Sequence, residues 1–253
     1  MTSRLRPVTV AHRGDSAQYP ENSLAAFQSA WEVGGAVVEC DVRLSRDGIP
    51  VVIHDHTTGR VGANNLVVAA TAACRLAATR LRPLHHESTP VETIPLLGDI
   101  LQQVPPGRHL YLECKVVSAV KPVCRLLKEN RFDADRVTFL SFLPPVLEAV
   151  HHLMPGGARL LLGEPSHTPH QRINQACRCK ATGLDLHLTD AVDEQWAQAL
   201  RSHGLSFHVW TVDAIEGVQQ ALELGVDSIT TNRPGWLSTV LDDLCGTHAR
   251  LPH

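Results

Sequence analysis

Short apolar runs alternate with amphipathic stretches along most of the chain. The runs are rich in Val, Ile and Leu and have the length of buried strands, and the stretches between them repeat apolar residues at helical spacing. A first helix is predicted over 22–33, with Leu24, Phe27 and Trp31 on one stripe and Asn22 as its N-cap. The predicted strands are Val8–Ala11, Ala36–Asp41, Ile49–His54, Leu110–Cys114, Arg136–Ser141, Arg159–Gly163, Gly183–Leu186, Ser206–Thr211 and Asp227–Ile229.

Strand–helix alternation of this regularity favours a parallel sheet with helical crossovers. The pattern is interrupted over 57–93, a segment that holds Gly59, Gly62, Asn64 and Asn65, an alanine-rich patch and a polar run over 85–88. Because the alternation resumes at Leu96, we interpret this segment as an insertion rather than a linker. A chain of 253 residues fits one large α/β domain, and we expect a single domain over 1–253.

The composition excludes several classes of protein. Hydrophobic residues make up 43% of the chain, and the formal net charge of −3, with both signs interspersed, argues against a nucleic-acid surface or a basic membrane patch. No apolar run approaches the roughly 18 residues of a membrane span, and no secretory signal is visible. The odd count of seven cysteines is typical of reduced thiols. We expect a cytoplasmic protein with no nucleic-acid partner and no stable membrane insertion; its oligomeric state stays unknown.

Charged residues occur at the ends of several predicted strands: His12, Arg13, Glu39, Asp41, His54, Glu113 and Lys115. The carboxyl ends of parallel strands meet at one edge of a sheet, where catalytic groups gather. Strand side chains alternate between faces, so Glu39 shares a face with Asp41, and Glu113 shares one with Lys115. Burial of so many charges without a cation or an anionic ligand is costly. The set therefore indicates a site that holds a hard divalent cation and moves protons around a phosphate.

Each of these residues, taken alone, also has a structural interpretation. Glu39 and Asp41 form a weak motif that is usually the solvated face of an edge strand. Lys115 can be an ordinary lysine whose stem lies on apolar surface, and Arg13 a partner in a surface ion pair. A lone histidine at a strand end is more often a structural hydrogen-bonding residue than a catalyst. The coincidence of several polar groups at one predicted edge favours the functional interpretation.

Several short motifs follow one another along nearly the whole chain. They are His12-Arg13-Gly14, Pro20-Glu21-Asn22-Ser23, Glu39-Cys40-Asp41-Val42, Asp47-Gly48, His54-Asp55, Leu112-Glu113-Cys114-Lys115, Ser141-Phe142, Trp210-Thr211-Val212 and Gly225-Val226-Asp227-Ser228-Ile229-Thr230-Thr231. In this order they resemble the glycerophosphodiester phosphodiesterase family, most of all its short cytoplasmic bacterial members. The resemblance implies an α/β fold, a (β/α)₈ TIM barrel with a small insertion after the second strand, where 57–93 falls.

The resemblance also implies a metal-dependent enzyme. Glu39, Asp41 and Glu113 would be the ligands of one divalent metal ion, Mg²⁺ or Ca²⁺, because an all-carboxylate set suits these ions rather than zinc. Cys40 and Cys114 are interleaved with the carboxylates. They should point away from the site, since strand side chains alternate.

By the same resemblance, His12 and His54 are the general base and the general acid, and the two roles can be exchanged. Arg13 and Lys115 would bind the substrate phosphate and stabilise the charge that develops on its oxygens. The implied substrate is a small glycerophosphodiester, hydrolysed to glycerol 3-phosphate and an alcohol. Internal attack by the neighbouring glycerol hydroxyl, through a cyclic phosphate, and direct attack by water both stay open.

Five further residues have weaker assignments. Trp210 is expected in the substrate pocket near the glycerol, with a core position as the alternative. His187 either lines the same pocket or makes a structural hydrogen bond. Glu21 and Asn22 are expected to order the first loop and its helix. Asn232 stands where many relatives have aspartate, at a loop or pocket edge outside the metal set.

Two other functions remain open. A lysophospholipase D would use the same machinery on longer lipids and would need an exposed apolar rim or a membrane-docking helix, neither of which is clear in the sequence. A non-catalytic barrel that serves as a scaffold is disfavoured, because the whole set of histidines, carboxylates and cations is intact.

Overall fold

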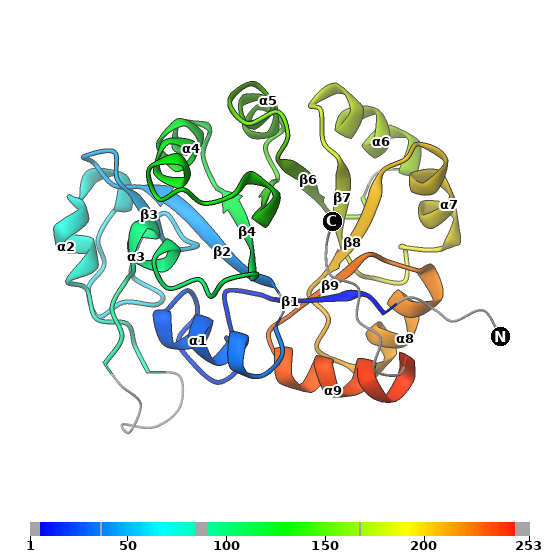
Figure 1. The fold of residues 1–253 in the computed structure, drawn as a ribbon, viewed down its shortest axis with the longest axis horizontal. Helices are drawn as coiled ribbons and strands as arrows, with labels where there is room; N and C mark the ends of the chain where they lie inside the picture. Colours follow the sequence, from blue (N-terminus) through cyan, green and yellow to red (C-terminus); the bar gives the residue numbers. More distant parts are fainter. Residues whose placement is uncertain (1–5, 36, 84–90, 167, 246–253) are drawn as a thin grey trace.

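Parallel strands form a closed ring in the computed structural model, which describes residues 6–35, 37–83, 91–166 and 168–245. Within these residues eight strands pair in chain order, and the last pairs with the first (Figure 1). They are β1 (Val8–Ala11), β2 (Val37–Leu44), β4 (His109–Cys114), β5 (Val137–Ser141), β6 (Ala158–Gly163), β7 (Gly183–His187), β8 (Ser206–Trp210) and β9 (Ser228–Thr231). The predicted (β/α)₈ barrel is confirmed.

Helices surround the ring and connect successive strands (Figure 1). They are α1 (Leu24–Glu32), α3 (Leu97–Leu101), α4 (Val120–Glu129), α5 (Pro144–Leu153), α6 (Pro169–Arg178), α7 (Glu194–Ser202), α8 (Ile215–Leu224) and α9 (Pro234–Cys245). No helix in the described ranges has both the length and the apolar character needed to cross a membrane.

Strand side chains alternate between two cores. Outward-facing residues such as Phe139 pack with the helices, and inward-facing residues such as Val10 and Leu160 form a smaller cluster inside the ring. Cys40 and Cys114 belong to the outer core, as the alternation predicts. Their neighbours in the sequence, the acidic residues of β2 and β4, therefore face the barrel interior.

The first helix begins later than predicted, and its N-cap is Ser23 rather than Asn22. The Ser23 hydroxyl accepts a hydrogen bond from the N–H of Ala26 at 3.1 Å. Asn22 has a φ of 58°, a left-handed conformation that asparagine tolerates better than most residues. The N-cap prediction for Asn22 is wrong because this residue turns the chain before the helix and uses its side chain elsewhere.

The predicted strand Ile49–His54 is shorter in the structure and lies outside the ring. β3 (Pro50–Val52) pairs antiparallel with β2 after the Asp47-Gly48 turn, where Gly48 has a φ of 75°.

The insertion follows β3, as predicted, and lies beside the barrel around α2 (Ala73–Ala77) (Figure 1). It packs a satellite core of its own, which includes Ile53, Val68, Leu76 and Ile94. The polar run predicted over 85–88 lies outside the described residues.

Gly14 shapes the turn that follows β1. It has a φ of 83°, and a Cβ at this position would lie 2.6 Å from the carbonyl carbon of Ala26 in α1. Only glycine allows the chain to turn this close to the helix.

We expect Gly14→Ala to destabilise the protein by about 2–4 kcal/mol, because strain from the positive φ adds to a clash with backbone. Gly48→Ala is the matched control: its φ is also positive, at 75°, but nothing lies within 4 Å of the added Cβ. That control should lose only about 1 kcal/mol. Urea unfolding of both variants measures the difference, and equal losses would contradict the close approach at Gly14.

Candidate active site

The three predicted metal ligands lie on two neighbouring strands of the ring. Glu39 and Asp41 are on β2, Glu113 is on β4, and the parallel register pairs Asp41 with Glu113. One carboxylate oxygen of each residue lies within 4.8 Å of those of the other two. All three side chains are buried. The structure therefore brings together the set that the sequence predicts.

Two cationic side chains, Lys115 and Arg13, compensate this negative charge. Nζ of Lys115 lies 2.8 Å from Oδ1 of Asp41 and 2.7 Å from Oε1 of Glu113. Nε of Arg13 lies 3.0 Å from Oδ2 of Asp41, and the Arg13 main-chain N–H donates to Oε2 of Glu39 at 3.0 Å. Arg13 has a φ of 58°, a conformation that costs non-glycine residues about 1–3 kcal/mol. The contacts with Asp41 and Glu39 hold it there.

Asn22 fixes Asp41 from another direction. Its Nδ2 donates to Oδ2 of Asp41 at 2.8 Å, and the main-chain N–H of Asp41 donates to Oδ1 of Asn22 at 3.2 Å. The left-handed turn at Asn22 thus ties the loop after β1 to the central carboxylate of β2.

The carboxylates differ in how readily they ionise. Burial and the neighbouring negative charges raise the pKa of Glu39 and of Glu113. Burial acts in the same direction on Asp41, but the charges of Lys115 and Arg13 outweigh it and lower the pKa of this residue. A cluster of buried, hard oxygen donors with excess negative charge is the donor set that Mg²⁺ and Ca²⁺ prefer. The residues present therefore fit the implied metal.

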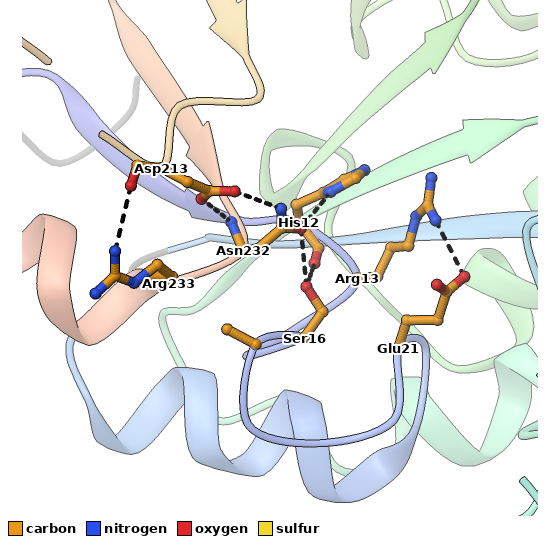
Figure 2. Close-up of a pocket in the computed structure, with 8 residues that line it drawn as sticks. His12, Arg13, Ser16, Glu21, Asp213, Asn232 and Arg233 are labelled. Carbon is orange, nitrogen blue, oxygen red and sulfur yellow. Dashed lines mark hydrogen bonds and ion pairs between the residues drawn. The ribbon is translucent and has the colours of Figure 1, made fainter. Parts of the chain in front are cut away.

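A chain of hydrogen bonds supports His12 (Figure 2). Nδ1 of His12 lies 2.8 Å from Oδ1 of Asn232, and Nδ2 of Asn232 donates to Oδ2 of Asp213 at 2.6 Å. Because Asp213 accepts from the amide nitrogen, the amide oxygen faces His12; this assigns the proton to Nδ1 and the lone pair to Nε2. Burial, and then the charge of Arg13, lower the pKa of His12 to about 4. The ring is therefore neutral at pH 7.

His54 follows β3 and lines the same cavity as His12. Its Nδ1 lies 2.7 Å from Oδ1 of Asp55. Burial lowers the pKa of His54, although the charge of Asp41 and the hydrogen bond with Asp55 oppose this. Both predicted acid–base residues are thus held at Nδ1 by a side-chain oxygen.

Arg60, from the insertion, contacts both Glu21, which holds Arg13, and Asp55, which holds His54. Its Nη1 and Nη2 lie 2.6 and 2.7 Å from the two oxygens of Glu21, and its Nε lies 2.7 Å from Oδ2 of Asp55. Glu21 also accepts from Nη1 of Arg13 at 3.0 Å. The hydrogen bonds from Arg60 lower the pKa of Asp55 to about 2. One exposed guanidinium therefore connects both sides of the site through two carboxylates.

A cavity of about 150 Å³ extends from these groups to the late strands. Trp210 lines it, and the Trp210 Nε1–H donates to the main-chain oxygen of Asp185 at 3.2 Å. His187 lies beside Trp210, with ring centroids 4.9 Å apart, and its Nδ1 is 2.9 Å from Oε2 of Glu164. The structure thus brings Trp210 to the cavity and His187 to the outer side of that tryptophan.

A second hollow, of about 500 Å³, shares His12 and Arg13 with the first (Figure 2). Its other lining residues include Ser16, Glu21 and Arg233. His12 and Arg13 therefore line both the cavity and this hollow.

Sequence reasoning missed Asp213 and Arg60 and gave Asn232 only an edge position. Asp213 directly follows the Trp210-Thr211-Val212 motif, so a carboxylate after a strand was a signal that could have found it. Arg60 carries no such signal, because only the folded insertion brings it to Glu21 and Asp55.

Two histidines, two cations and a carboxylate cluster in a TIM barrel are the kinds of group that a phosphoesterase site contains. The model of the glycerophosphoryl diester phosphodiesterase family matches residues 12–236, and the chain belongs to this family. The family and the enzyme class expected from the sequence are confirmed.

Individual relatives cover almost the whole chain. A glycerophosphodiester phosphodiesterase of Caldanaerobacter subterraneus subsp. tengcongensis is 30% identical over an alignment of 244 residues that covers 91% of this chain and 96% of that protein. A phosphodiesterase of Oleispira antarctica, solved with its product sn-glycerol-3-phosphate, is 25% identical with a TM-score of 0.83, covering 93% of this chain and 97% of the other. A glycerophosphodiester phosphodiesterase of Parabacteroides distasonis shares the fold at 22% identity, with a TM-score of 0.81 and coverage of 95% and 99%.

We expect Arg60→Gln to lower kcat/KM for phosphodiester hydrolysis about 10-fold or more, because Glu21 and Asp55 lose their common partner and misplace Arg13 and His54. Stability should change by less than about 1 kcal/mol, since the Arg60 side chain is 47% exposed. Arg60→Lys should recover part of the rate. Steady-state kinetics and thermal unfolding measure the two effects.

Arg201→Gln is the matched control, because Arg201 is 55% exposed and pairs with Glu194 at 2.5 Å on α7. If both glutamine variants kept the wild-type rate, the coupling through Arg60 would have no role in the site.

Proposed function

We propose that this protein is a metal-dependent phosphodiesterase that hydrolyses glycerophosphodiesters to glycerol 3-phosphate and an alcohol. The observation that carries the proposal is the convergence of two histidines, two cations and the carboxylates of Glu39 and Glu113 on one cavity, with Asp41 in the same carboxylate cluster. Family membership supports the reaction class. The sn-glycerol-3-phosphate in the Oleispira antarctica relative supports the product.

Arg13 and Lys115 bind the non-bridging oxygens of the phosphate. Both side chains line the cavity, and both already lie against carboxylate oxygens that share the charge and geometry of phosphate oxygens. In the reaction they stabilise the negative charge that grows on the phosphorus oxygens.

The two histidines divide the proton transfers according to their partners. His12 faces a neutral amide, Asn232, which leaves its pKa low and its ring neutral, so it removes the proton from the attacking oxygen. His54 faces the carboxylate of Asp55, whose hydrogen bond favours the imidazolium and opposes the lowering of the His54 pKa by burial, so His54 is assigned the donation of a proton to the departing alcohol oxygen. The attacking oxygen is the neighbouring glycerol hydroxyl or a water. In either route one P–O bond forms as the bond to the alcohol breaks.

Glu39, Asp41 and Glu113 would hold the metal ion, Mg²⁺ or Ca²⁺. When bound, the ion supplies Lewis-acid stabilisation of the phosphate oxygens. The two hollows that meet at His12 and Arg13 offer space for both substituents of a phosphodiester. The single-domain organisation and the cytoplasmic location stay predictions from the sequence.

We expect the purified protein to hydrolyse glycerophosphocholine and glycerophosphoethanolamine, to lose the activity in EDTA, and to regain it with Mg²⁺ or Ca²⁺. Release of glycerol 3-phosphate measures turnover. His12→Ala and Glu39→Gln should each lower kcat by about 1000-fold or more, since each removes a group needed in the reaction.

Glu129→Gln on the exposed face of α4 is the control and should keep the wild-type rate. EDTA-resistant hydrolysis would contradict the metal site, and inertness toward every glycerophosphodiester would contradict the function. A His12→Ala variant with near-wild-type activity would show that the acid–base assignment is wrong.

The pH profile tests the role of Asn232. Loss of activity on the acidic side should follow protonation of His12, whose pKa lies below the ordinary 6.5. Asn232→Leu removes an acceptor that favours the imidazolium, so the pKa of His12 falls further and the acidic limb of kcat/KM moves to lower pH. The rate on the plateau should also fall about 10–100-fold, because the ring loses its orientation. A lower rate with an unmoved acidic limb would point to general damage instead.

A further inference from the structure

Two buried side-chain oxygens on the wall of the active-site cavity have no partner. Asp185 on β7 and Thr230 on β9 are 1% and 3% exposed, and both line the cavity. Neither Oδ1 of Asp185 nor Oγ1 of Thr230 has a hydrogen-bond partner within the described part of the chain. Buried polar atoms in folded proteins are nearly always paired, so this exception points to a group that is supplied from outside.

These oxygens lie on strands other than those of the carboxylate cluster. The order of strands places β7, β8 and β9 together; β7 and β8 lie across the ring from β2 and β4, which carry the proposed metal ligands, and β9 is separated from β2 by β1. Trp210 on β8 lies between the two residues and is anchored on the main-chain oxygen of Asp185. A substituent of the phosphate that extends away from Glu39 and Glu113 therefore meets Asp185, Trp210 and Thr230.

The chemistry of the wall selects for hydroxyl groups. A hydroxyl both donates and accepts, so one or two of them can satisfy a carboxyl and a threonine hydroxyl together. A quaternary ammonium group has no N–H and would leave both oxygens unpaired, and one face of Trp210 is already covered by His187. The cavity of about 150 Å³ has room for a few water molecules or a glycerol-sized group. Leu140 and Leu162 supply apolar walls around it.

We propose that Asp185 and Thr230 form a hydroxyl-binding subsite that receives the terminal hydroxyl of the substrate glycerol. The inference rests on the proposed function and adds its specificity-determining residues. The 2-hydroxyl stays next to the phosphorus because it neighbours the ester carbon, whereas the terminal hydroxyl extends one carbon further, toward β7 and β9. The subsite selects a free glycerol over one whose terminal hydroxyl is acylated, as in a 1-acyl lysophospholipid.

The test compares two substrates on the wild type and on four variants. The substrates are glycerophosphocholine and an analogue that keeps the 2-hydroxyl but has hydrogen in place of the terminal hydroxyl. Wild type should prefer the first by about 10–100-fold in kcat/KM, since a site built for a hydroxyl discriminates against its absence. Asp185→Ala and Thr230→Val should reduce this preference to within about 3-fold, with most of the loss on glycerophosphocholine.

Thr9→Val is the matched control for Thr230→Val. Thr9 is also buried, at 2% exposure, with an unpartnered Oγ1, but it is not among the residues that line the cavity. This variant should keep the wild-type preference. Asp185→Asn, which retains an acceptor and a donor, should recover part of it.

A measurement without turnover completes the test. Calorimetry should show that wild type binds sn-glycerol 3-phosphate more tightly than propane-1,2-diol 1-phosphate, and that Asp185→Ala and Thr230→Val lose this difference. Equal losses on both substrates, or a wild type without preference, would overturn the subsite and leave the proposed function standing. A wild type that hydrolyses neither substrate would overturn the proposed function, and the subsite with it.

Discussion

The repulsion among three buried carboxylates is the constraint on which the active-site end of the barrel depends. Asp41 is fully buried and touches Lys115, Arg13 and Asn22, which reach it from the end of β4 and from the loop after β1. This arrangement requires a local cost in conformational energy, at the left-handed turns of Arg13 and Asn22 and at the glycine turn of Gly14. The loop after β1 is therefore shaped by the charge on β2 as much as by its own sequence.

Repulsion between carboxylates also determines which side chains hold the two histidines. Each ring is held at Nδ1, which leaves Nε2 for the reacting atoms, but the two partners differ in charge. A second carboxylate at position 232 would face Asp213, which already accepts a hydrogen bond from Asn232 at 2.6 Å. An amide satisfies His12 and Asp213 at once, whereas two adjacent carboxylates would repel each other. An asparagine at position 232 is thus what this particular network needs.

Much of this architecture could be predicted from the sequence, because it depends on local periodicity and on strand alternation. The burial of Cys40 and Cys114 away from the site follows from a period of two, and so does the shared orientation of Glu39 and Asp41. The role of Asn22 could not be predicted, because its sequence position suits a helix cap equally well and only the neighbouring strand decides between them. Arg60 could not be found for a similar reason: its partners, Glu21 and Asp55, lie in other loops.

The two halves of the cavity present opposite energetic problems to a substrate. On the side of β2 and β4, Lys115 and Arg13 are already paired with Asp41, so a phosphate must replace these contacts rather than fill an empty site. A cation that neutralises the carboxylates would release both side chains for this purpose. On the side of β7 and β9, the oxygens of Asp185 and Thr230 are unpaired, so a hydroxyl gains contacts without displacing any. Binding of the phosphate therefore requires the exchange of existing ion pairs, whereas binding of the glycerol supplies partners to oxygens that have none. This division explains how a site with such strong internal ion pairs can still favour one substituent of a phosphodiester over another.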